Sequence, residues 1–259
     1  MNRINQLFIH RKEPVLSIYF CAGHPLLENT LPTLRALQDH QIDLVEIGIP
    51  FSDPMADGPV IQHAATQAIR NGMSLRCLFQ QLEHVRPTIH IPLVLMGYLN
   101  PILQFGFRSF CEQCKRVGID GVIIPDLPFQ EYLMHYKPTA DSYDLKIIML
   151  ITPETSEARI RQIDEHTDGF IYMVSSAAIT GAQKKFDEQK QAYFQRIQAM
   201  QLKNPLMVGF GISNHQTLEA ANAHAAGAII GSKFVQLLEE CKGNADMAIE
   251  CLKERLKEV

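Results

Sequence analysis

Short apolar runs rich in valine, isoleucine and leucine recur along the chain, and each is followed by a longer segment with helical spacing. Eight such runs occupy residues 15–22, 43–48, 91–97, 121–124, 146–151, 169–174, 205–208 and 228–230. Their starts lie about thirty residues apart, which is the length of a βα unit. The runs are apolar on both faces, as parallel strands covered by helices are. The pattern therefore predicts eight parallel strands that alternate with helices.

Eight βα units in 259 residues predict an α/β fold, a single-domain (β/α)8 TIM barrel with additional short helices. No linker rich in Pro, Gly or Ser divides the chain, so we expect one domain over residues 1–259. An open doubly wound sheet that binds a dinucleotide would carry G-x-G-x-x-G after its first strand. The turn after the first run is instead CAGHP, at residues 21–25, which favours the barrel. Catalytic residues of a barrel lie at the carboxyl ends of its strands.

Several helical segments carry start signals. Ser74 precedes an apolar stripe, Ser213 and Gln216 form a capping-box pattern, and Pro153 favours a helix start over residues 154–163. A last helix is predicted over residues 246–259.

Composition narrows the function classes. Hydrophobic residues make up 46% and charged residues 20%, with a formal net charge of −4, as in an ordinary globular protein. This balance gives no reason to expect nucleic acid or an anionic membrane as partner, and no apolar run is long enough to cross a bilayer. Residues 15–22 resemble a buried strand more than a signal peptide, because Glu13 and Pro14 separate this apolar run from the basic residues that precede it. We therefore expect a cytoplasmic protein.

Cysteine and histidine spacing predicts no metal site. Of the six cysteines only Cys111 and Cys114 form a C-x-x-C pair, and they lie in a predicted helix over 107–117 with no second pair. His24 and His63 have no third ligand at metal spacing.

Glu46 is the first candidate for chemistry. It lies inside the second apolar run, where an unpaired carboxylate is costly to bury. Strand alternation places Leu44, Glu46 and Gly48 on one face, suited to line the mouth of a barrel. The alternative is an outward or salt-bridged Glu46, but we favour the functional interpretation.

The loop after this run holds two more carboxylates, Asp53 and Asp57. It can fold back over the strand end, so that Asp57 and Glu46 share one pocket and work as general acid and base. Ordinary turn or capping chemistry explains the two aspartates equally well.

Glycines follow the last two runs, in GFGIS at 209–213 and GS at 231–232. Glycine lets backbone N–H groups approach an anion, and these two loops often bind phosphate in barrels. Plain tight turns remain the alternative. Residues 175–182, which follow the sixth run, are small and polar enough to form a closing lid or a surface loop.

The stretch LVEIGIPFSDPMADGP at 44–59 closely resembles the signature of the tryptophan synthase alpha chain family. The similarity continues through GIDG at 118–121, PDLP at 125–128, ITGA at 179–182 and the two glycine motifs, in the order of the family and over nearly the whole chain. The first signature is specific, whereas the glycine motifs are shared with other phosphate-binding barrels.

The resemblance implies retro-aldol cleavage of indole-3-glycerol phosphate to indole and glyceraldehyde 3-phosphate. It implies Glu46 as acid and then base, and Asp57 as the group that binds the indole N–H. It further implies two sets of binding residues: an indole pocket of Tyr19, Tyr98, Ile123, Tyr172 and Phe210, and a phosphate site of Gly181, Gly211, Gly231 and Ser232.

The resemblance also implies a partner, a beta chain that carries pyridoxal phosphate and receives indole, in an α2β2 assembly. No cofactor is expected in this chain itself. The expected contact residues are Asp53, Pro54 and Met55 with Asn100 and Pro101.

The chain departs from the family at Ser176 and Ala178, where an Arg and a Gly are usual, and at His24, where an Asp is common. The first departure leaves open an alternative function, a mainly regulatory barrel that activates the beta chain and has weak lyase activity. Another phosphate-binding barrel, such as an isomerase, would need a different acid/base set at the strand ends.

Overall fold

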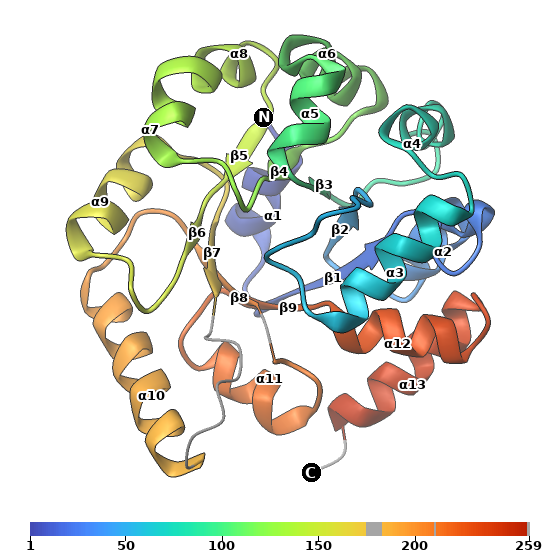
Figure 1. The fold of residues 1–259 in the computed structure, drawn as a ribbon. Helices are drawn as coiled ribbons and strands as arrows, with labels where there is room; N and C mark the ends of the chain where they lie inside the picture. The colour runs from blue at the N-terminus through green and yellow to red at the C-terminus, as the bar shows by residue number, and fades with distance from the viewer. Residues whose placement is uncertain (175–182, 210, 258–259) are drawn as a thin grey trace.

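The computed structural model describes residues 1–174, 183–209 and 211–257. Its strands form one all-parallel sheet in the order β5-β4-β3-β2-β1-β9-β8-β7-β6. In Figure 1 the strands lie at the centre and the helices surround them. The strands are β1 Val15–Cys21, β2 Leu44–Gly48, β3 Leu93–Met96, β4 Gly121–Ile123, β5 Lys146–Ile148, β6 Leu150–Ile151, β7 Ile171–Val174, β8 Leu206–Gly209 and β9 Gly227–Ile230.

Strands β5 and β6 are two halves of the fifth predicted run, separated by Met149. Strand β5 pairs with β4, and β6 pairs with β7. The carbonyl of Met149 accepts a hydrogen bond of 3.0 Å from the backbone N–H of Tyr172. The chain itself therefore completes the ring, and the predicted eight-unit barrel is confirmed.

Helices cover the outside of the ring. They are α2 Thr30–Asp39, α3 Pro59–Arg70, α4 Leu75–Gln81, α5 Leu99–Phe105, α6 Phe107–Val117, α7 Phe129–Glu131, α8 Lys137–Ser142, α9 Glu157–His166, α10 Gln183–Ala199, α11 His215–Asn222, α12 Ser232–Glu240 and α13 Ala245–Lys257, with short 3₁₀ and π segments at Leu27–Asn29 and Tyr132–Tyr136. Within the described ranges no helix is long and apolar enough to cross a membrane.

The predicted start of α4 is confirmed, since Ser74 accepts the N–H of Cys77. Two other predicted starts are wrong. Helix α11 is capped by Asn214 rather than Ser213, because the side chains of Asn214 and Thr217 complete a capping box there. Helix α9 begins at Glu157, because Ser156 accepts the N–H of Arg159 and so supplies the N-cap.

Helix α1 (Arg3–His10) precedes the first strand and was not expected. Its Ile4 is completely buried and joins an interior cluster with residues such as Val15 of β1, Leu44 of β2 and Ile229 of β9. Figure 1 shows α1 near the middle of the ring. Val15 and Leu44 are the first residues of their strands, so α1 closes the amino end of the barrel.

Candidate active site

A cavity of about 320 Å³ opens at the carboxyl end of the barrel. Its volume is within the range of small-molecule sites, about 300–1,000 Å³. The wall combines two carboxyl groups, two tyrosines, a glycine-rich side and apolar side chains. The lining residues are Tyr19, Glu46, Asp57, Ile61, Met96, Tyr172, Gly211, Ile212, Ser213, Ile229, Gly231, Ser232, Lys233 and Gln236.

Glu46, the third residue of β2, is 0% exposed and lies on the interior face of its strand with Leu44. The hydroxyl of Ser17 donates a hydrogen bond of 3.1 Å to its Oε1. Its Oε2 is buried and has no hydrogen-bond partner within the part of the chain that the structure describes. Burial raises the pKa of Glu46 to about 8, with the Ser17 hydrogen bond acting in the opposite direction. Glu46 is therefore mostly protonated at neutral pH and can donate a proton.

Asp57 reaches the same cavity from the loop between β2 and α3, and its side chain is half-buried. The hydroxyl of Tyr98 donates a hydrogen bond of 2.9 Å to its Oδ2, and that hydroxyl accepts the backbone N–H of Ala56 at 2.9 Å. Burial raises the pKa of Asp57, whereas the Tyr98 hydrogen bond favours the carboxylate. The two carboxyls thus face one cavity in different surroundings, as general acid and base chemistry requires.

Tyr19 of β1 and Tyr172 of β7 line the same cavity as the two carboxyl groups. The hydroxyl of Tyr19 lies where a Cβ of residue 48 would be, and that of Tyr172 where a Cβ of residue 209 would be, so only glycine fits at either position. Burial raises the pKa of both tyrosines, and the nearby carboxyls of Glu46 and Asp57 raise it further. Both rings therefore stay neutral and offer flat, mostly apolar faces.

Another part of the cavity wall is suited to an anion. Gly211 follows β8 with φ +78°, in the left-handed region that favours glycine, and nothing lies within 4 Å of where its Cβ would be. Gly231 precedes α12, and no side chain caps the N-terminus of that helix. Its first N–H groups, beginning at Ser232, are therefore available to a ligand. Lys233 adds a positive charge to this wall, which the sequence alone did not suggest.

Two expected members of the indole pocket lie differently. Ile123 is completely buried in the interior cluster of the barrel and does not line the cavity. Tyr98 acts from the rim through its bonds to Asp57 and Ala56 and is not a lining residue either. Gly181 and Phe210, like the family departures at Ser176 and Ala178, lie outside the described residues.

The expected contact residues lie in two segments, the loop that carries Asp57 and the start of α5. Met55 is 92% exposed, and Asp53 and Pro54 adjoin it in the same loop. Asn100 and Pro101 lie in the first turn of α5, directly after Tyr98. Because Tyr98 bonds both to the loop and to Asp57, these segments are connected to the cavity.

Ser17 was also missed by the sequence analysis, as were the apolar lining residues Ile61, Met96 and Ile229. One signal was available, since Ser17 shares a strand face with Tyr19 two positions later in an otherwise apolar run. No such signal marks the apolar residues, because they are ordinary core residues in sequence.

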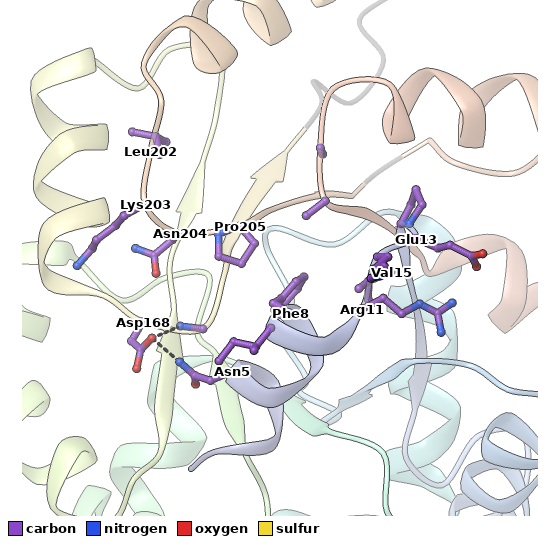
Figure 2. A pocket seen from close by; sticks show the side chains of 16 residues that line it. Asn5, Phe8, Arg11, Glu13, Val15, Asp168, Leu202, Lys203, Asn204 and Pro205 are labelled. Atoms are coloured by element: carbon purple, nitrogen blue, oxygen red, sulfur yellow. Dashed lines mark hydrogen bonds between the residues drawn. The ribbon is translucent and has the colours of Figure 1, made fainter.

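A second cavity, of about 570 Å³, lies at the amino end of the barrel (Figure 2). Figure 2 shows the side chain of Asn5, from α1, reaching Asp168 before β7, with a hydrogen bond of 2.7 Å. Asp168 also pairs with Lys146 at 2.8 Å, and Arg11 pairs with Asp43 at 2.7 Å. These ionic groups already satisfy one another, so this pocket is part of the structural support. Within the described ranges no three His, Cys, Asp or Glu side chains could hold a metal ion.

The family model described as tryptophan synthase alpha chain matches residues 6–259. The alpha chain of Phocaeicola vulgatus is 66% identical over 99% of this chain and 100% of its own length. That of Flavobacterium psychrophilum is 51% identical over 93% of this chain and 94% of its own length.

Solved structures agree. The tryptophan synthase subunit alpha of Legionella pneumophila is 34% identical and superimposes with a TM-score of 0.86, covering 99% of this chain and 96% of the other. A chain from the tryptophan synthase complex of Pyrococcus furiosus is 32% identical with a TM-score of 0.82, covering 95% and 98%.

Proposed function

Since the chain belongs to the tryptophan synthase alpha chain family, we propose that Glu46 and Asp57 carry out its lyase chemistry at the carboxyl end of the barrel. The family's reaction, cleavage of indole-3-glycerol phosphate to indole and glyceraldehyde 3-phosphate, is the activity of this chain. The observation that carries the assignment of roles is the buried Glu46 with one unpartnered oxygen, on the same cavity as Asp57.

Cleavage needs a proton on carbon 3 of the indole ring and the removal of one from the adjacent glycerol hydroxyl. Glu46 begins as the acid and protonates carbon 3. The resulting carboxylate then takes the hydroxyl proton, the O–H electrons form the carbonyl group, and the C–C bond breaks as its electrons return to the ring. Glu46 ends protonated, ready for the next cycle. Such acid–base catalysis contributes about 10²–10⁴-fold.

Asp57 works as a carboxylate. It accepts the indole N–H and stabilises the positive charge that develops on the ring after protonation. The hydrogen bond from Tyr98 supports this role, because it fixes the carboxylate and opposes the effect of burial on its pKa.

The rest of the cavity binds and orients the substrate. We assign the indole ring to Tyr19, Tyr172 and Phe210, and the phosphate to Gly181, Gly211, Gly231 and Ser232. The open backbone at Gly211 and the uncapped start of α12 support the phosphate assignment. We revise the roles expected for two residues: Tyr98 acts through its hydrogen bond to Asp57, and Ile123 packs in the interior cluster beside Met96.

The chain works with a tryptophan synthase beta chain. We propose that this partner carries the pyridoxal phosphate, that the assembly is α2β2, and that the contact includes Asp53, Pro54, Met55, Asn100 and Pro101. The exposed Met55 supports this contact. We further propose that residues 1–259 form one domain that works in the cytoplasm, where its six free cysteines stay reduced.

The test measures indole release from indole-3-glycerol phosphate by the protein, by Glu46→Gln and by Asp57→Asn, each with and without beta chain. We expect Glu46→Gln to lose at least about 10³-fold in kcat while it still binds substrate by calorimetry. Near-normal turnover of Glu46→Gln would overturn its role. No cleavage by the unchanged protein in either condition would instead favour the regulatory alternative.

A further inference from the structure

Ser17 is a polar residue in an apolar layer of the barrel. It lies in β1, where its register partners are Leu44 of β2 and Ile229 of β9, both in the interior cluster. The side chain is completely buried. A buried hydroxyl is costly unless it makes a hydrogen bond, and the one that the structure gives it is to Glu46.

The strand register fixes the direction of this contact. Tyr19 is the register partner of Glu46, so Ser17 lies two residues nearer the amino end of the barrel. Its hydroxyl therefore reaches Oε1 of Glu46 from below, at 3.1 Å. The second oxygen, Oε2, has no partner among the described residues, and Glu46 lines the cavity. One oxygen is fixed and the other is left for the substrate.

We propose that Ser17 is a positioning residue for the cleavage reaction, whose hydroxyl fixes Oε1 of Glu46 and makes Oε2 the oxygen that delivers and recovers the proton. This inference rests on the proposed role of Glu46 as acid and base.

The chemistry of the carboxyl group explains how one hydrogen bond has this effect. A protonated carboxyl oxygen is a poor acceptor, so a hydroxyl that donates to Oε1 keeps the acid proton on Oε2. When Oε2 has protonated carbon 3, Ser17 still donates to Oε1 and stabilises the carboxylate. The same Oε2 then takes the proton from the glycerol hydroxyl, and the carboxyl group does not rotate between the two steps.

Two substitutions of nearly equal shape isolate the hydroxyl. Ser17→Thr keeps it, whereas Ser17→Val replaces it with a methyl group. We expect Ser17→Val to lower kcat about tenfold with KM little changed, and Ser17→Thr to retain most of the activity.

The pH profile separates positioning from packing. Protonated Glu46 starts the reaction, so kcat/KM falls as the pH rises through the pKa of Glu46. Because the Ser17 hydroxyl favours the carboxylate, its loss raises that pKa. We expect the alkaline limb to move to higher pH in Ser17→Val and to stay in place in Ser17→Thr.

Infrared difference spectroscopy reads the same contact without turnover. The carbonyl stretch of protonated Glu46, identified by its absence in Glu46→Gln, should move to higher frequency in Ser17→Val and in Ser17→Ala. The alanine variant supplies the result if valine prevents folding.

Unchanged kcat, pH limb and carbonyl stretch in folded Ser17→Val or Ser17→Ala would overturn the role of Ser17. If Glu46→Gln is inactive in that case, the proposed function survives and only this inference fails. An active Glu46→Gln would instead reject the proposed function.

Discussion

At the amino end of the barrel the buried carboxyl of Asp120 contacts two guanidinium groups, whereas at the carboxyl end the buried carboxyl of Glu46 contacts one hydroxyl. Asp120 pairs with Arg3 at 2.9 Å and with Arg86 at 2.7 Å, and it also accepts the backbone N–H of Leu93 at 2.9 Å. Both acids are buried. Their surroundings nevertheless differ, since two guanidinium groups contact Asp120, whereas an apolar cavity penalises a charge on Glu46.

The two ends of the barrel therefore have different roles: the amino end stabilises the fold, and the carboxyl end carries the catalytic groups. Paired charges at the amino end join α1 to the starts of the strands. Both oxygens of Asp120 already accept hydrogen bonds from protein groups, so this carboxyl serves the structure and not a ligand. At the carboxyl end an unpaired acid costs stability but provides a proton at neutral pH. Substitutions at the two ends should therefore change different measurements.

The largest effect on stability is expected at the amino end. Asp120→Asn leaves the charges of Arg3 and Arg86 without their buried counterion, which costs about 3 kcal/mol in the free energy of unfolding. Urea unfolding measures this loss. The kcat of the folded fraction should stay within about twofold. Glu83→Gln, which removes only a surface pair with Arg116, should cost less than about 0.5 kcal/mol. A catalytic defect in folded Asp120→Asn would contradict the division of the two ends.

The next substitution, Glu46→Gln, is expected to increase the free energy of unfolding rather than lower it. The pKa of Glu46 is raised in the folded protein, so its contribution to stability is present below its ordinary pKa near 4.5 and is lost as pH rises through about 8. Glu46→Gln removes this dependence and should stabilise the protein by about 2 kcal/mol at pH 6, because that pH lies about 1.5 units above the ordinary pKa of the group. At pH 4 it should have almost no effect. Urea unfolding at both pH values makes the comparison, and equal stability of the two proteins at pH 6 would show that burial of Glu46 costs little.

The next effect, about tenfold in kcat, is expected from Tyr98, whose hydroxyl contacts Asp57. Tyr98→Phe removes the hydrogen bond to Asp57, so the pKa of Asp57 rises. The acid limb of the kcat/KM profile, where Asp57 is protonated, should move to higher pH, and kcat should fall about tenfold. Tyr136→Phe is the matched control, because Tyr136 packs against Phe107 outside the cavity. If the acid limb of Tyr98→Phe stays in place, protonation of Asp57 is not what determines that limb.

The smallest effect concerns the partner. Met55→Asp places a charge on the exposed loop that carries Asp57 and should weaken beta-chain binding by about 1 kcal/mol, measured by calorimetry. Met247→Asp, on α13, is the control at another exposed methionine. If both variants bind equally well, the contact surface lies elsewhere.

The fold was predictable because each strand of the barrel is apolar on both faces and is followed by an amphipathic helix. Local competition explains the misplaced helix starts, since Asn214 and Ser156 supply better caps than the residues expected from spacing. Helix α1 was missed because what fixes it is the packing of Ile4 inside the barrel, a contact between distant parts of the chain.

Within the site, Glu46 was predictable because a carboxylate inside an apolar strand needs an explanation. Ser17 was not, since its contact depends on the register between β1 and β2, which residue types alone do not encode. The sequence also gave no means to separate Tyr98 and Ile123 from the lining residues. Their positions depend on contacts between distant segments, the hydrogen bond of Tyr98 to Asp57 and the packing of Ile123 in the interior cluster.

The closure of the amino end by α1 also determines how products leave. Because Ile4 is completely buried in the interior cluster with Val15 and Leu44, the described side chains fill the barrel at this end. We therefore expect indole released beside Glu46 to leave by the mouth of the cavity through which its precursor enters. A protein that binds over this mouth would therefore receive the indole ring directly, provided that its own surface continues the cavity.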